Sequence, residues 1–114
     1  MSAFDAALAD TTADPDTQAM ALCRDGDWES FGLLVERHRD RLVRYLARLL
    51  GDRDLGEEIA QETFVRLWLA AGRYREEGRF EAYLYSIGTR LARSSERRRR
   101  APTRAPRSRP KRAR

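Results

Sequence analysis

The chain has few of the side chains that usually carry catalysis or bind metals. Cys23 is its only cysteine and His38 its only histidine, which excludes disulfides within the chain and most zinc and hydrolytic sites. No glycine-rich phosphate loop is present. Adjacent glutamates at 57–58 and 76–77 are more typical of solvated surface than of acid–base catalysis. The sequence therefore favours a binding module over an enzyme, and it predicts no cofactor and no metal ion.

One surface suited to protein binding comes from the segment EEIAQETFVRLW, residues 57–68. At about 100° per residue, its core-facing arc contains Ile59, Ala60, Thr63, Phe64 and Leu67. Val65, and Leu69 one turn later, fall instead among acidic residues. An apolar contact ringed by groups that pair with a basic helix is typical of a docking face, although scattered surface hydrophobes are also common. The candidate docking residues are Glu58, Gln61, Glu62, Val65 and Leu69.

A second surface combines aromatic rings with arginines, from Tyr74 into the last predicted helix. Rings stack on unpaired bases, each contributing about 1–3 kcal/mol, while guanidinium groups contact phosphates. This pattern favours single-stranded nucleic acid, although Phe80 and Tyr83 also suit a core position, and arginines on an outer helix face are often only solvated. The candidate residues are Tyr74, Arg75, Arg79, Phe80, Tyr83, Ser86, Arg90, Arg93 and Arg97.

Helices are expected to position both surfaces. A short helix, TQAMALCRD, follows Asp16 as its N-cap and stops at Gly26. Apolar residues at three- and four-residue steps then predict a long helix from its N-cap Asp27 to Gly51. His38 lies on or beside the apolar stripe of this helix. We expect it to be a packed, partly buried side chain rather than a ligand.

Two further helices carry the candidate residues. The first runs from about Asp54 to Ala71, with Gly72 as its C-cap. The second starts near Gly78 or Arg79. Its core stripe consists of Phe80, Leu84, Ile87 and Leu91. No segment alternates with period two, so the expected fold class is all-α: a small bundle of three main helices plus a short N-terminal helix.

Charge is distributed unevenly along the 114 residues. The first 29 residues hold seven acids against one base, whereas the last 18 hold ten bases and no acid. This asymmetry suggests an anionic partner for the tail, nucleic acid before membrane. We expect residues 1–15 to be loose, residues 16–100 to form the folded domain, and residues 101–114 to be a disordered Arg/Pro-rich tail.

Nothing in the sequence indicates a membrane location. The N-terminus is acidic and lacks the basic segment and apolar run of a secretory signal. No apolar run approaches the roughly 20 residues that cross a bilayer. We therefore expect a cytoplasmic protein with no membrane span.

Three segments carry a resemblance to a known family: DGDWESFGLLVERHRDRLVRYLARLLGD, EEIAQETFVRLW and YREEGRFEAYLYSIGTRLA. Together with the basic residues that follow, they resemble region 2 of bacterial RNA polymerase sigma factors, closest to the extracytoplasmic-function group. The resemblance runs from about Gly26 to Arg100. Its most specific parts are Gln61-Glu62 with Phe64 and Trp68, and the segment from Tyr74 to Ile87.

The resemblance implies a role in transcription initiation. In the family, the helix that matches residues 57–69 docks on the clamp coiled coil of the largest subunit of core RNA polymerase. This would place Glu58, Gln61, Glu62 and Val65 at that interface, with Leu69 at its edge. The segment 74–79 matches a loop that captures a flipped base of the promoter minus-ten element, and the last helix matches the one that holds the opened strand. Catalysis stays with the polymerase, and an anti-sigma partner is left open.

Departures from the family pattern keep other hypotheses open. Tyr83 stands where the family usually has tryptophan, and Arg90 where it usually has an asparagine that takes part in base recognition. The family also continues into a second helical domain, whereas this sequence ends in the arginine–proline tail. Tyrosine can still stack at position 83, whereas Arg90 and the missing second domain favour an interaction-only protein that competes for the polymerase clamp without promoter opening. A third hypothesis is a general nucleic-acid-coating protein driven by the tail, residues 101–114.

Overall fold

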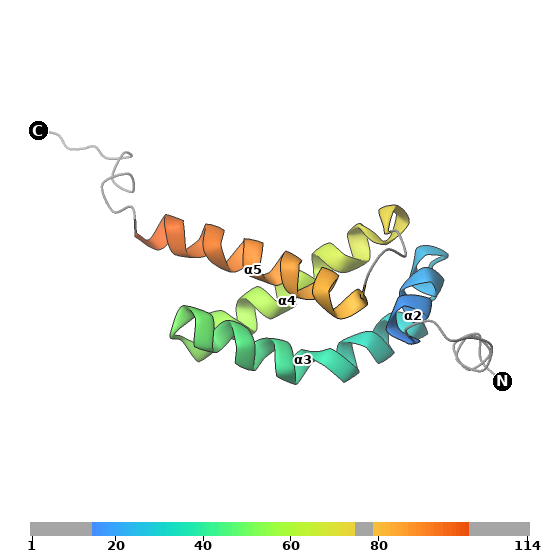
Figure 1. Ribbon diagram of the computed structural model, residues 1–114, viewed down its shortest axis with the longest axis horizontal. Helices are drawn as coiled ribbons and strands as arrows, with labels where there is room; N and C mark the ends of the chain where they lie inside the picture. Colours follow the sequence, from blue (N-terminus) through green and yellow to red (C-terminus); the bar gives the residue numbers. More distant parts are fainter. Residues whose placement is uncertain (1–14, 75–78, 101–114) are drawn as a thin grey trace, which may run out of the picture.

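The computed structural model describes residues 15–74 and 79–100, which form four α-helices and one short 3-10 helix (Figure 1). In chain order these are α2 (Pro15–Arg24), α3 (Trp28–Leu50), α4 (Arg53–Leu69), η1 (Ala71–Arg73) and α5 (Phe80–Arg99). The described ranges contain no strand, and the predicted all-α bundle of three long helices and one short helix is confirmed. The predictions for residues 1–14 and 101–114 lie outside the described residues.

Capping residues explain where the long helices begin and end. At the start of α3, the Asp27 carboxylate accepts hydrogen bonds from the Ser30 N–H at 3.5 Å and the Ser30 hydroxyl at 2.8 Å. Gly51 ends α3 in the left-handed conformation, with a φ of 70°. Asp52 then caps α4 by accepting from the Leu55 N–H at 3.1 Å. The predicted N-cap at Asp27 and the predicted stop at Gly51 are confirmed.

The structure corrects two other predicted helix ends. α2 begins at Pro15, so Asp16 lies in its first turn instead of capping it; proline fits there because the first helical N–H needs no partner. α4 ends at Leu69, and Gly72 is not its C-cap. The chain continues from Ala70 into η1, whose tighter turns satisfy the nearby carbonyl groups without a left-handed glycine.

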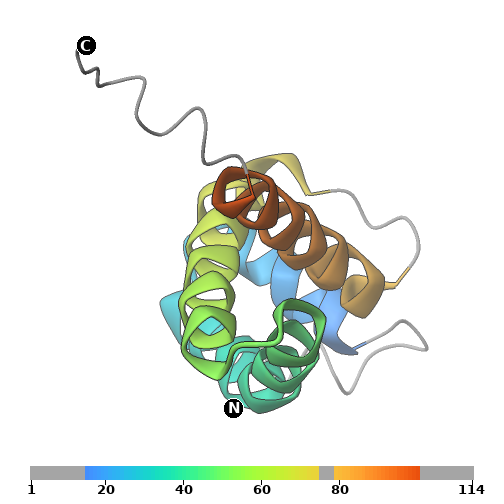
Figure 2. The same cartoon turned by 90° about the vertical axis from the view of Figure 1, so that its left-hand side faces the viewer.

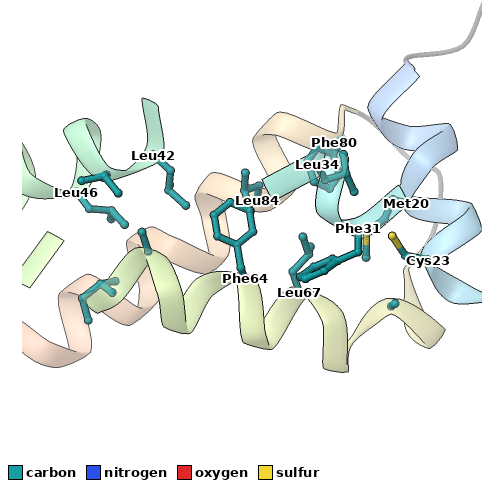
Figure 3. Packing of buried hydrophobic residues seen from close by; sticks show 14 of the residues in the cluster. Met20, Cys23, Phe31, Leu34, Leu42, Leu46, Phe64, Leu67, Phe80 and Leu84 are labelled. Carbon is teal, nitrogen blue, oxygen red and sulfur yellow. The ribbon is translucent and has the colours of Figure 1, made fainter. Parts of the chain in front are cut away.

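An apolar core lies between α3, α4 and α5, which surround it when the bundle is viewed from one end (Figure 2), and α2 packs against one end of α3. Figure 3 shows buried side chains of this core, which include Leu34, Leu42, Leu46, Phe64, Leu67, Phe80 and Leu84, together with Met20, which α2 adds to the core. The predicted core stripe of α5 is confirmed at Phe80 and Leu84, which are fully buried, whereas Ile87 and Leu91 are only partly buried against the core. Further along α5 the buried face runs through Gly88, Ala92 and Ser95. Burial of these side chains is the main force that holds α4 and α5 in place.

Two small residues allow the helices to approach closely. A Cβ added to Gly56 would lie 2.7 Å from the backbone nitrogen of Ala47, so the crossing of α3 and α4 requires glycine. At Gly88, where α5 meets α4, an added Cβ would lie 3.3 Å from Thr63 Oγ1. Thr63 is fully buried, and its hydroxyl donates to the Ile59 carbonyl at 2.7 Å. These contacts fix α4 and α5, the two helices that carry the predicted binding surfaces.

Charged side chains join α2 to α3. Arg37 Nη1 donates to Asp16 at 2.6 Å, and His38 Nε2 lies 2.8 Å from the other oxygen of that carboxylate. Burial alone would raise the pKa of Asp16, but the hydrogen bonds and charges of His38 and Arg37 outweigh it and hold the pKa below its ordinary 3.8. His38 is buried against the Phe80 ring, as predicted for a packed histidine.

Across the two described stretches, every helix is too short or too polar to cross a bilayer.

Candidate functional site

Two exposed apolar side chains on α4, Val65 and Leu69, form a ridge between two grooves. Val65 is 48% exposed and Leu69 73% exposed, which confirms the prediction that they lie away from the core. One groove lies between α4 and α3, and the other lies between α4 and α5. Both grooves are lined by Val65 and Leu69, so the ridge is their common wall.

The groove between α3 and α4 has an aromatic floor and a volume of about 510 Å³. The ring centroid of Trp28 lies 5.3 Å from that of Phe31 and 4.9 Å from that of Trp68, and Phe31 and Trp68 are 5.0 Å apart. Trp28 remains 65% exposed despite these contacts. A partner that entered this groove would therefore cover a large apolar surface that the fold itself leaves open.

Acidic residues dominate the rim of this groove, which we call the acidic groove. Its charged lining consists of Asp54, Glu57 and Glu58 against the single cation Arg39. No three potential metal ligands come together within the described part of the chain, so this cluster is not arranged as a metal site. An apolar floor with an acidic rim suits a helix that carries apolar and basic side chains.

Only part of the acidic groove was predicted from the sequence. Glu58 and Gln61, two of the candidate docking residues, are exposed and line it. Trp28, Asp54 and Glu57 were missed. The sequence position of Trp28 could have indicated its exposure. It directly follows the N-cap of the long helix, where a large apolar side chain has few neighbours in its own helix.

The groove between α4 and α5 has the opposite charge, and we call it the basic groove. Its volume is about 650 Å³, and three guanidinium groups, those of Arg66, Arg73 and Arg90, line it against the single carboxylate of Glu62. Arg66 Nε donates to Glu62 at 3.0 Å. Glu62 was predicted together with Glu58 and Gln61, but the structure places it on the other side of the ridge. Arg66 and Arg73 were not predicted as site residues.

The exposed face of α5 brings together Ser86, Arg90, Arg93 and Arg97, as the three- and four-residue spacing indicated. Tyr83 is partly buried and lines the basic groove with Ser86 and Arg90. The Ser86 hydroxyl donates to the Tyr83 carbonyl at 2.7 Å. The candidate Arg79 is also exposed, directly before α5, and the candidate Arg75 lies outside the described residues.

The structure corrects the placement of two aromatic candidates. Tyr74 is 4% exposed and Phe80 is fully buried, so neither ring offers a face to a base in this arrangement. The Tyr74 ring lies 5.0 Å from the Tyr83 ring, and its hydroxyl lies 3.3 Å from Thr17 Oγ1. Arg24 Nη1 also donates to the Tyr74 carbonyl at 2.9 Å. The buried Tyr74 ring thus packs against Tyr83, and Phe80 belongs to the core.

Comparison with known proteins gives one matching family and several relatives. The family model for sigma-70 region 2 matches residues 34–101. The RNA polymerase sigma-H factor of Pseudomonas aeruginosa is 29% identical over 83 residues, which cover 73% of this chain and 43% of that protein. The ECF RNA polymerase sigma factor SigW of Bacillus subtilis is 32% identical over 66 residues, 58% of this chain and 35% of SigW.

A third relative, the ECF RNA polymerase sigma factor SigE of Mycolicibacterium smegmatis, is 39% identical over 62 residues, 54% of this chain and 24% of SigE. In each of these three comparisons, the match spans less than half the length of the relative. No solved structure matches the chain significantly.

Proposed function

Since the chain belongs to the sigma-70 region 2 family, we propose that it is an ECF-type transcription initiation factor that binds core RNA polymerase and the opened minus-ten strand of a promoter. One observation carries this proposal: two grooves of opposite charge share one apolar ridge. Such an arrangement suits a basic protein helix on one side and a nucleic-acid strand on the other.

The polymerase side of the proposal is the ridge with its acidic surroundings. An interface of this kind gains affinity from a central apolar contact and gains orientation from the charged rim. The residues proposed to contact the clamp coiled coil of the polymerase are Glu58, Gln61, Glu62, Val65 and Leu69. An anti-sigma protein that covered the same ridge would exclude the polymerase.

The DNA side of the proposal is the exposed face of α5. Tyr83 would stack on an unpaired base, and the arginines that follow would contact phosphates. Tyr74 and Phe80 are proposed to act indirectly, by holding Tyr83, while Arg79 lies directly before α5 and Arg75 stays a candidate from the sequence. The residues proposed to contact the strand are Tyr83, Ser86, Arg90, Arg93 and Arg97. The chain contributes binding and positioning, and bond formation stays with the polymerase in the cytoplasm.

Promoter opening tests this proposal directly. A fluorescent base placed in the minus-ten element should brighten when core polymerase and the chain are added together. The double variant Tyr83→Ala, Arg93→Ala should lose most of that signal while it still binds polymerase. A matched control is the double variant Arg44→Ala, Arg48→Ala, which removes exposed arginines of α3 that line neither groove. If the Tyr83 and Arg93 variant opens DNA as well as the parent, the DNA face is assigned incorrectly.

A second candidate function is competition for the polymerase clamp. Arg90 favours it, because the family usually has an asparagine for base recognition at this position. Run-off transcription separates the two functions: an initiator supports transcript synthesis by core polymerase, whereas a competitor lowers the output of a complete sigma factor.

Deleting residues 101–114 tests the general coating hypothesis. This deletion should abolish strand binding if the tail drives it, and should largely spare polymerase retention under the first two functions.

A further inference from the structure

The basic groove contains two arginines that the proposed function does not use. Arg66 lies on α4 and Arg73 on η1, and both line the groove together with Arg90 of α5. We propose that this groove holds the sugar–phosphate backbone of a single nucleic-acid strand, with Arg66 and Arg73 as its phosphate-binding residues on the α4 side, and that Glu62 controls the availability of Arg66. The inference rests on the proposed function and deepens it.

The composition of the groove favours nucleic acid over a protein helix. Its charged lining has three guanidinium groups and one carboxylate, whereas the acidic groove has one guanidinium and three carboxylates. Its uncharged lining includes Ile87, Tyr83 and the ridge. Guanidinium groups pair with phosphate oxygens in bidentate fashion, and apolar or aromatic surface accepts sugars and unstacked bases. A strand whose phosphates lie between α4 and α5 would pair with the guanidinium groups and also cover the apolar and aromatic surface.

The ion pair between Glu62 and Arg66 supplies the control. Their side chains are 47% and 57% exposed, and the Nε to Oε2 distance is 3.0 Å. Exposed pairs one turn apart on a helix are weak, so a phosphate can replace the carboxylate. Glu62 nevertheless neutralises Arg66 and repels phosphate in the free chain. A basic side chain on a protein docked at the ridge would draw Glu62 away, and strand binding would strengthen.

Fluorescence anisotropy with a labelled single-stranded oligodeoxynucleotide tests the phosphate site in the full chain. Arg66→Gln with Arg73→Gln should weaken binding by about fivefold or more, and should reduce the slope of log affinity against log salt by about 0.7 for each phosphate that is no longer neutralised. A control for the loss of one exposed guanidinium group is Arg53→Gln, which breaks a similarly exposed pair with Glu57 on the same helix, at a residue that lines neither groove. Since the basic tail is unchanged in every variant, the differences report the groove.

The proposed regulation of Arg66 by Glu62 has its own test in the same assay. Glu62→Gln should bind the oligonucleotide about twofold to fivefold more tightly at low salt, because the competing carboxylate charge is gone. Glu57→Gln, which removes a carboxylate of the other i,i+4 pair on α4, should change affinity much less. Equal affinities for Glu62→Gln and the parent would contradict the proposal that Glu62 regulates the availability of Arg66.

Three outcomes separate this inference from the proposed function. If the Arg66 and Arg73 variant binds the strand like the parent while the Tyr83 and Arg93 variant does not, the groove is not a phosphate site, although the proposed function stands. If the Arg66 and Arg73 variant no longer binds core polymerase but still binds the strand, the groove is a protein interface and the inference is overturned. If the parent chain binds no oligonucleotide, the inference and the DNA side of the proposed function both fall.

Discussion

Trp28 lies edge-on against Trp68, with ring centroids 4.9 Å apart and ring planes at 88°. The first residue of α3 thereby meets the last turn of α4, at the floor of the acidic groove. These are the only two tryptophans in the sequence, so the intrinsic fluorescence of the protein reports on this groove. A protein that covers the groove should shift the emission, because the exposed Trp28 ring would leave water.

Replacing Trp28 by alanine should weaken docking while the fold stays intact. The side chain is 65% exposed, so the free energy of unfolding should fall by less than about 1 kcal/mol. Binding to core polymerase should weaken by about fivefold or more, because exposed tryptophans in apolar grooves are frequent hot spots. Denaturant titration and polymerase titration measure the two effects. Leu49→Ala is the control, since Leu49 is 37% exposed and lines neither groove; equal losses in both variants would contradict this assignment.

The close crossing of α3 and α4 makes Gly56 a sensitive position. Gly56→Ala should destabilise the protein by about 1–3 kcal/mol, because the added methyl group would overlap the backbone of Ala47. Gly32 is the matched control, since it is also helical and a Cβ there would meet no other side chain or neighbouring helix within 4 Å. Gly32→Ala should instead stabilise α3 by about 0.5–1 kcal/mol. Thermal unfolding of both variants checks the opposite signs, and a stable Gly56→Ala variant would contradict the observed helix approach.

The pH dependence of stability should reflect Asp16. The pKa of Asp16 in the folded protein is lowered from the ordinary value of 3.8 that it has in the unfolded chain. Its contribution to the free energy of unfolding is therefore fully present above pH 3.8 and is lost as the pH falls through the folded-state pKa. Asp16→Asn should cost about 1–3 kcal/mol at pH 6, and its difference from the parent should shrink below about pH 4. Unfolding experiments across this range measure both effects. Asp40→Asn should have little effect at any pH, because Asp40 is 84% exposed; a parent curve that stays flat below pH 4 would exclude this role of Asp16.

Arg90 is the position where strand affinity and base recognition can be separated. Arg90→Asn should weaken binding to single-stranded DNA severalfold and lower the salt slope by about 0.7, because one phosphate would no longer be neutralised. It should also increase the preference for one minus-ten sequence over scrambled DNA, because the amide donates and accepts hydrogen bonds. Anisotropy with matched and scrambled strands checks both results. Unchanged salt dependence would show that Arg90 does not contact phosphate in the parent.

Local chemistry made much of this fold predictable. Asp27 and Gly51 were identified as helix boundaries because capping depends on a few neighbouring residues. The exposure of Val65 and Leu69 followed from helical periodicity alone. The end of α4 was predicted incorrectly, since a glycine suggests a C-cap only when the chain adopts a left-handed turn there, and Gly72 instead lies in η1.

Features that depend on long-range packing were not predictable in this way. Tyr74 was expected to contact nucleic acid, but it is buried: its ring packs against Phe80 and Tyr83, and its hydroxyl lies beside Thr17, 57 positions earlier. The two-sided character of α4 was also missed. Glu62 and Glu58 belong to one polar face in the sequence, and only the positions of α3 and α5 assign them to different grooves. Periodicity identifies an exposed arc, whereas the neighbouring helices determine which groove each residue lines.

Retention of Val65→Asp on immobilised core polymerase tests the central claim that the ridge on α4 is the docking surface. Val65 is 48% exposed, so the variant should fold normally. A carboxylate at the centre of an apolar contact should lower affinity by about tenfold or more. Leu49→Asp, which places the same charge outside both grooves, should bind like the parent. Retention of Val65→Asp at the parent level would contradict the assignment of the ridge.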